Sequence, residues 1–141
     1  MISQDEARRL TTAPAVAVVD DDESIRRALY RLLRSDGLAA ATFASAHEFL
    51  EAHRRQNFAC VVLDVYMGRM SGLDLAERMA SEGTSLPIVL ITAHDDERIR
   101  ERAQRVGVTA YLRKPVDATL LLNVVHQATG INASPATPLA S

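Results

Sequence analysis

Five short apolar runs, each followed by a segment whose apolar residues recur with helical spacing, are the most restrictive feature of this sequence. The runs begin near Ala15, Leu38, Phe58, Leu86 and Val108. Strands that alternate with helices of this length form a parallel sheet, because right-handed crossovers place the helices on its two faces. We therefore predict an α/β fold with a doubly wound, five-stranded parallel sheet and five helices.

The predicted helices differ in how firmly they are held. Ser45 is a good N-cap with Glu48 three residues later, which is the pattern of a capping box. The fourth helix, roughly Asp96–Val106, has a thin apolar stripe among many charged residues, so we predict that it moves most easily. The last helix ends at Gly130. Its predicted buried residues are Leu120, Leu121, Val124, Val125 and Ala128.

The length and composition are those of one compact domain. The chain has 141 residues, of which 48% are hydrophobic, so it can bury a substantial core. We predict that this domain spans residues 14–130, after a flexible leader at 1–13. Residues 131–141 are rich in Ala, Ser, Thr and Pro, which indicates a flexible tail or a truncated linker.

Charge and hydropathy argue against several classes of partner. The formal net charge is −2, from 16 basic and 18 acidic residues without a dense basic block, which is not the pattern of a nucleic-acid-binding surface. No apolar stretch approaches the ~18 residues of a membrane-spanning helix, and residues 1–14 lack the apolar centre of a secretory signal. We predict a cytoplasmic protein that binds neither DNA nor membranes. The single cysteine, Cys60, lies in the most apolar run and is predicted to be a core residue.

Polar side chains directly follow four of the apolar runs: Asp20 with Asp21, then Asp64, Thr92 and Lys114. The carboxyl ends of parallel strands meet at one edge, where open α/β sheets bind ligands, so these side chains are predicted to share a crevice. Two carboxylates ~4 Å apart repel each other by ~4 kcal/mol at an effective dielectric near 20. A hard divalent cation with oxygen ligands relieves that repulsion, and we predict a Mg²⁺ site.

Each of these motifs has a simpler interpretation when it is taken alone. Acids at the start of a helix complement its dipole, and Asp64 can be a solvated carboxylate at a strand end. Thr92 can be an ordinary β-branched strand residue, and Lys114 a solvated surface lysine. Their joint placement at the ends of the predicted strands favours a site that handles phosphate.

Taken together, these motifs resemble the receiver domain of bacterial two-component response regulators. The resemblance covers about Pro14 to Gly130 and implies a sheet of order 2-1-3-4-5. It also implies a phosphorylation-activated switch that takes a phosphoryl group from a sensor histidine kinase or a phosphotransfer protein. The matching segments are Val-Val-Asp-Asp-Asp (18–22), Val-Val-Leu-Asp (61–64), Met67 with Gly72, Ile-Thr-Ala (91–93) and Lys-Pro (114–115).

The resemblance implies a role for each residue of the acidic cluster. Asp64 would be the phosphoacceptor. Asp20 and Asp21 would position Mg²⁺ together with Asp64, and the backbone carbonyl of Tyr66 would complete the protein ligands. Such a domain is a signalling switch rather than an enzyme, since it catalyses only its own aspartyl phosphorylation and dephosphorylation.

By the same resemblance, Thr92 and Lys114 would contact the phosphoryl group and Tyr111 would be the switch aromatic. Charge-assisted hydrogen bonds from Thr92 and Lys114 would together supply ~3–6 kcal/mol, against the ~5.5 kcal/mol that moves a two-state equilibrium from 1:99 to 99:1. The output face would then be the fourth helix, fifth strand and fifth helix, which is also the candidate surface for a homodimer.

Three residues near the predicted site are expected to tune its behaviour. Receivers usually carry proline four residues after the phosphoacceptor, whereas this chain has Gly68, which predicts a more flexible loop. Tyr66 and His94 stand two residues after Asp64 and Thr92, at positions that border the route of the hydrolytic water in receivers. Two bulky rings there predict slow self-dephosphorylation. The alternative for His94 is a loop histidine that faces solvent.

The sequence also bears on two other classes of function. A pseudo-receiver would keep the fold as an unphosphorylated protein-binding module, but the complete set of polar residues argues against it. An aspartate-nucleophile phosphatase would need a second acid where this chain has Tyr66. A flavodoxin would need a hydroxyl-rich phosphate loop after the first strand, where this chain has three acids.

Overall fold

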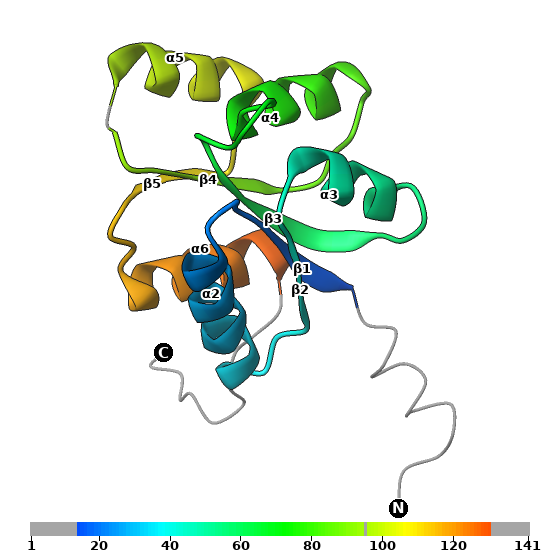
Figure 1. The fold of residues 1–141 in the computed structure, drawn as a ribbon, viewed down its shortest axis with the longest axis vertical. Coiled ribbons are helices and arrows are strands. Elements are labelled where there is room, and N and C mark those ends of the chain that lie inside the picture. Colours follow the sequence, from blue (N-terminus) through cyan, green and yellow to red (C-terminus); the bar gives the residue numbers. More distant parts are fainter. Residues whose placement is uncertain (1–13, 95, 131–141) are drawn as a thin grey trace, which may run out of the picture.

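The computed structural model describes residues 14–94 and 96–130. Five parallel strands form one sheet of order β2-β1-β3-β4-β5 (Figure 1). The strands are β1 (Ala15–Val19), β2 (Ala40–Phe43), β3 (Phe58–Asp64), β4 (Ile88–Thr92) and β5 (Ala110–Arg113). The predicted fold class and strand order are confirmed. The predicted leader at 1–13 and tail at 131–141 lie outside the described residues, and the predicted domain bounds stay a prediction.

Five helices of the described chain cover the two faces of the sheet. Helices α3, α4 and α5 lie on one face, and α2 and α6 lie on the other (Figure 1). The helices are α2 (Glu23–Ser35), α3 (Ala46–His53), α4 (Gly72–Ser81), α5 (Glu97–Val106) and α6 (Ala118–Thr129). Within residues 14–94 and 96–130, no helix is long and apolar enough to cross a membrane.

The three inner strands of the sheet, β1, β3 and β4, are almost entirely apolar because both of its faces are covered there. Alternate residues of the central strand β3 enter two separate cores: Val61 and Leu63 pack on the side of α3 and α4, while Cys60 and Val62 pack on the side of α2 and α6. Burial raises the pKa of the Cys60 thiol to about 12. Cys60 is therefore a neutral core residue at pH 7, as predicted.

Side-chain caps fix where the helices begin. The Ser45 hydroxyl accepts a hydrogen bond from the Glu48 backbone N–H at 3.1 Å, as expected of an N-cap. The Glu48 carboxylate, however, accepts from the N–H of Ala44 at 2.8 Å and not from that of Ser45, so the predicted reciprocal capping box is wrong in its second half. A complete capping box stands instead at the start of α4, between Ser71 and Asp74.

The buried face of α6 is narrower than predicted. Leu121 and Val125, one turn apart, are fully buried, whereas Leu120 is 48% exposed. Successive residues on a helix are rotated by about 100°, so a helix that points Leu121 and Val125 into the sheet turns Leu120 toward solvent. The prediction that Leu120 is buried is wrong.

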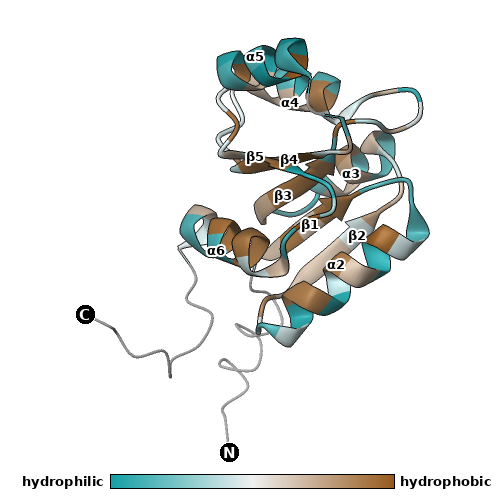
Figure 2. Ribbon diagram, turned by 90° about the vertical axis from the view of Figure 1, so that its left-hand side faces the viewer, coloured by the Kyte–Doolittle hydropathy of each residue, from teal (hydrophilic) through white to brown (hydrophobic). Residues whose placement is uncertain are grey.

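Helix α5 carries little apolar surface. Ala103 is its one fully buried residue, with Ile99 and Val106 partly buried beside the core. Figure 2 shows α5 as largely hydrophilic, in contrast to the strands that it covers. The thin apolar stripe predicted for this helix is therefore present, and α5 is held by few apolar contacts.

Candidate functional site

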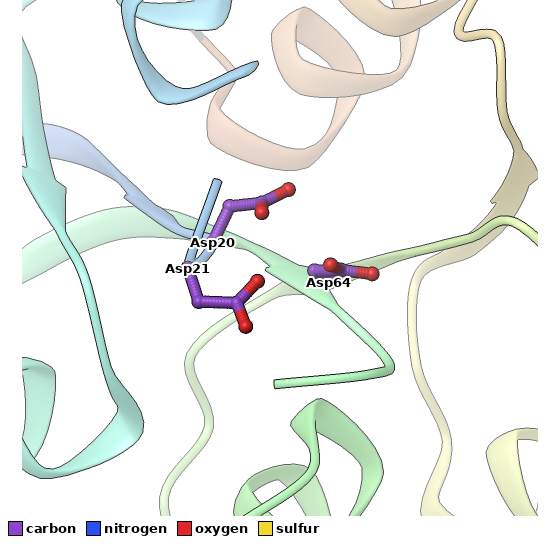
Figure 3. A group of neighbouring side chains, drawn as sticks. All are labelled: Asp20, Asp21 and Asp64. Carbon is purple, nitrogen blue, oxygen red and sulfur yellow. The ribbon is translucent and has the colours of Figure 1, made fainter. Parts of the chain in front are cut away.

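The acidic residues meet where β1 and β3 end. These strands are parallel neighbours in which Val19 pairs with Leu63, so the next residue of each strand, Asp20 and Asp64, comes to the same edge. Carboxylate oxygens of Asp20, Asp21 and Asp64 all lie within 4.8 Å of one another (Figure 3). Asp20 and Asp64 are buried, while Asp21 is exposed to solvent.

Local hydrogen bonds hold the two buried acids in place. Asp20 accepts from the backbone N–H of Asp22 at 2.9 Å, and Asp64 accepts from the N–H of Tyr66 at 3.3 Å. The Arg26 guanidinium donates to the backbone carbonyl of Asp20 at 2.8 Å. Asp22 itself is the N-cap of α2, where it accepts from two backbone N–H groups. The β1–α2 turn is thereby fixed around the carboxylates.

Lys114 reaches the acids from the end of β5. Its Nζ lies 3.2 Å from an Asp64 carboxylate oxygen and 3.4 Å from one of Asp20. Its backbone N–H donates to the carbonyl of Thr92 at 2.8 Å, which ties the β5 end to the β4 end. The structure thus brings Asp20, Asp64 and Lys114 together, as their positions after the strands predicted.

Burial and neighbouring charges shift the pKa values of Asp64 and Lys114. Burial, with the neighbouring charge of Asp20 next in weight, raises the pKa of Asp64 above its usual value, against the opposing effect of Lys114. Burial alone would lower the pKa of Lys114, but the Asp20 and Asp64 carboxylates outweigh it and raise that pKa. Lys114 therefore stays charged. Its single positive charge does not fully offset the effects of burial and of Asp20 on ionised Asp64.

The donor set of the cluster fits a magnesium ion. Three carboxylates supply oxygen ligands only, which is what a hard divalent cation prefers, and their mutual repulsion favours added positive charge. The predicted contribution of the Tyr66 backbone carbonyl stays a prediction.

Thr92 lies on β4, the neighbour of β3 in the sheet, and Tyr111 lies on β5 next to it. Thr92 is fully buried at the end of β4, where its hydroxyl donates to the His94 carbonyl at 2.9 Å and accepts from the His94 N–H at 3.1 Å. Tyr111 pairs with Leu90 in the sheet and is half-buried. The Arg100 guanidinium lies 6.0 Å from the centre of its ring. In this conformation the Thr92 hydroxyl is bonded to its own loop.

Tyr66 and His94 approach each other beside the acids. Their rings meet edge to face, with centroids 5.6 Å apart and planes at 82°. Both side chains are exposed to solvent, and the exposed fraction of Tyr66 is 46%. His94 therefore both faces solvent and contacts the Tyr66 ring. The two loops that follow β3 and β4 are therefore in contact through these rings.

Two glycines shape the loop after β3. Gly68 has φ +37°, which proline cannot adopt because its ring holds φ near −65°. A Cβ added to Gly72 would lie 2.2 Å from the backbone carbonyl oxygen of Asp64, so only glycine fits there. The Gly72 N–H also donates to the Val65 carbonyl at 2.9 Å. This close approach of α4 to the Asp64 backbone was not predicted from the sequence.

Comparison with known proteins identifies this arrangement. Residues 16–126 match the family described as the response regulator receiver domain. The chain belongs to this family. A crystal structure of a response regulator receiver protein from Burkholderia phymatum is 45% identical, with a TM-score of 0.74 over 85% of this chain and 98% of that one. This receiver domain thus shares its fold with a solved relative.

Curated relatives of the receiver domain include transcriptional regulators. The chain is 38% identical over 127 residues to the transcriptional regulatory protein TdiR of Thauera aromatica, which covers 90% of this chain and 56% of TdiR. It is 40% identical over 119 residues to nodulation protein W of Bradyrhizobium diazoefficiens, covering 84% of this chain and 52% of that protein. The chain spans about half the length of these relatives.

Membership of the family settles the class of function. The chain is a receiver domain of a two-component response regulator, a signal-transduction domain that is activated by phosphorylation. Neither the family match nor the relatives support the alternative of an unphosphorylated pseudo-receiver.

Proposed function

We propose that this receiver domain accepts a phosphoryl group on Asp64. The observation that carries the proposal is the buried Asp64 carboxylate. One of its oxygens lies 3.2 Å from Lys114 Nζ, and one lies within 4.8 Å of carboxylate oxygens of Asp20 and Asp21. A nucleophilic carboxylate needs a charged partner for the incoming phosphoryl oxygens, and Lys114 is already in place for this.

In the proposed reaction, an oxygen of Asp64 forms a bond to phosphorus while the P–N bond of a phosphohistidine breaks. The electron pair of that bond stays with the departing imidazole. Lys114 neutralises charge on the phosphoryl oxygens through its ammonium group. Mg²⁺ held by Asp20, Asp21 and Asp64, with the Tyr66 carbonyl, would supply further positive charge at these oxygens. Positioning and electrostatics are then the whole of the catalysis.

The switch that follows involves Thr92 and Tyr111. To bond the phosphoryl group, the Thr92 hydroxyl gives up its two bonds to the His94 backbone, and the space that it leaves can admit the Tyr111 ring. New bonds from Thr92 and Lys114 supply ~3–6 kcal/mol, close to the ~5.5 kcal/mol of a full population shift. The output face is then α5, β5 and α6.

The proposed partners are those of a cytoplasmic two-component pathway. A sensor histidine kinase or a phosphotransfer protein donates the phosphoryl group. The longer relatives named above are transcriptional regulators or nodulation proteins, which supports a role for this domain in controlling an output such as transcription. A homodimer through α5, β5 and α6 is one way to transmit the signal.

Mg²⁺-dependent labelling tests this proposal. Incubation with a small phosphodonor such as acetyl phosphate and Mg²⁺ is expected to add one phosphoryl group per chain, measured by intact-mass spectrometry. Replacing Mg²⁺ with a chelator should slow labelling on the order of 100-fold, because the carboxylates then repel the donor. Labelling that is absent with Mg²⁺, or unaffected by the chelator, would contradict the proposal.

Tyr66 and His94 are proposed to slow the loss of the phosphoryl group. Their rings are in contact, and two bulky rings at these positions would obstruct the approach of water in line with the bond to be broken. Replacing both with alanine is expected to shorten the phosphoryl lifetime roughly tenfold, equal to ~1.4 kcal/mol of barrier. The lifetime is measured by intact mass after the donor is removed. Tyr30→Ala, at an exposed tyrosine of α2, is the control, and an unchanged lifetime in the double variant would overturn this role.

A further inference from the structure

Arg102 links the weakly anchored helix α5 to helix α4. Its Nε and Nη2 donate to the two carboxylate oxygens of Glu77 at 3.1 and 2.6 Å, and Nη2 also donates to Asp74 at 3.3 Å. Both acids belong to α4, and the Glu77 contact is the bidentate arginine–carboxylate geometry. Since Ala103 is the one fully buried residue of α5, this polar contact adds to the few apolar contacts that hold the helix.

The first turn of α4, which carries Asp74, packs directly against the backbone of Asp64. Gly72, the first residue of α4, lies so close to Asp64 that an added Cβ would be 2.2 Å from its carbonyl oxygen. Asp74 closes the capping box by accepting from the Ser71 N–H at 3.2 Å, and the Ser71 hydroxyl accepts from the Asp74 N–H at 3.0 Å. One carboxylate, that of Asp74, therefore serves both the start of α4 and the contact with Arg102.

We propose that Arg102 is a positioning residue that holds α5 against α4 in the unphosphorylated domain and so favours the inactive conformation. This connection runs from Asp64 through Gly72 and the Ser71–Asp74 cap to α5. It is separate from the connection through Thr92 and Tyr111, and its coupling to activation rests on the function proposed above. A change at Asp64 can thus reach α5 by two connections, and reciprocally the position of α5 affects the site.

The charges of these residues support an intact contact at neutral pH. Hydrogen bonds from Ser71 and Arg102 outweigh burial and hold the pKa of Asp74 below its usual value. The Glu77 hydrogen bond is the foremost of the contacts that raise the pKa of Arg102. Asp74 and Arg102 are therefore both ionised across the physiological range.

The test compares Arg102→Gln with Arg105→Gln, which removes the same charge from an exposed position of the same helix. In the unphosphorylated chain, amide hydrogen exchange across α5 should be about fivefold faster in Arg102→Gln than in the control, as expected for loss of a well-formed surface ion pair. Affinity for beryllofluoride with Mg²⁺, a mimic of the phosphoryl group, should rise about fivefold, measured by calorimetry.

Exchanging the charges of Arg102 and Glu77 distinguishes loss of their contact from a general loss of structure in α5. Arg102→Glu and Glu77→Arg should each speed exchange in α5, and the double variant should recover part of the protection. Equal exchange in Arg102→Gln and Arg105→Gln, or no recovery in the double variant, would overturn the contact. Unchanged or weaker binding of the mimic by Arg102→Gln would overturn its bias toward the inactive state. If the native chain itself fails to bind the mimic, the proposed function fails, while exchange still decides the role of Arg102 in holding α5.

Discussion

Asp64→Asn is expected to reduce phosphoryl labelling by acetyl phosphate at least about 100-fold, because a neutral amide oxygen is a far weaker nucleophile than a carboxylate. The side chain keeps its size, so the shape of the site changes little. The measurement is intact mass after incubation with the donor and Mg²⁺. Asp22→Asn is the matched control: it removes an acid two residues from Asp20, and asparagine caps a helix as well as aspartate does.

The same variant is expected to be more stable than the native chain at pH 7. The raised pKa of Asp64 means that its ionised form is disfavoured in the folded state, so native stability is lost as pH rises through that pKa. Removing the charge should raise the free energy of unfolding by about 1 kcal/mol, or about 4 °C in Tm. Below about pH 3, where aspartate is protonated in both states, the difference should disappear.

Thermal unfolding followed by circular dichroism at both pH values checks this. Loss of labelling in a variant that is more stable cannot be due to unfolding. Full labelling of Asp64→Asn would show that another residue is the acceptor. Loss of labelling in Asp22→Asn would show that labelling requires the charge of the whole turn rather than one carboxylate.

Residues at the carboxyl ends of strands were predictable from the sequence. Once five apolar runs are assigned to a parallel sheet, the backbone brings Asp20, Asp64, Thr92 and Lys114 to one edge, whatever the side chains around them do. The structure confirms the sheet order and brings Lys114 between the two buried acids. This part of the site depends on periodicity and strand position alone.

Features that depend on distances between segments were not predictable in the same way. The closeness of Gly72 to the Asp64 carbonyl and the reach of Arg102 to Glu77 depend on how α4 and α5 pack, which no local pattern encodes. The Ser71–Asp74 spacing was an available signal for the start of α4. The prediction that Leu120 is buried was wrong for a related reason. A wide apolar stripe in the sequence does not determine which of two adjacent leucines faces the sheet.

The direction in which the Thr92 hydroxyl points was likewise not predictable from the sequence. Its position at the end of β4 was predictable, but its bonds to the His94 backbone depend on the fold of the following loop. These bonds matter for the energetics of the proposed switch, because Thr92 would exchange them for bonds to the phosphoryl group. The net gain expected from Thr92 in the proposed switch is accordingly at the lower end of the ~1.5–3 kcal/mol of a charge-assisted bond.

Gly72→Ala is expected to lower the free energy of unfolding by about 3 kcal/mol, or about 10 °C in Tm. The new Cβ would lie 2.2 Å from the carbonyl oxygen and 2.9 Å from the carbonyl carbon of Asp64. Both are backbone atoms and cannot rotate away, so α4 has to move off β3. Labelling of Asp64 should also slow, by up to about 100-fold for a shift of 1 Å in the nucleophile.

Gly83→Ala is the matched control for this variant. Gly83 has φ +78° and nothing within 4 Å of an added Cβ, so alanine there costs only backbone strain of about 1–2 kcal/mol and leaves the site untouched. Thermal unfolding and the labelling rate are measured on both variants. If Gly72→Ala were no less stable than Gly83→Ala and labelled normally, α4 would yield without cost. Its first turn could then neither sense the position of Asp64 nor pass that position to Arg102.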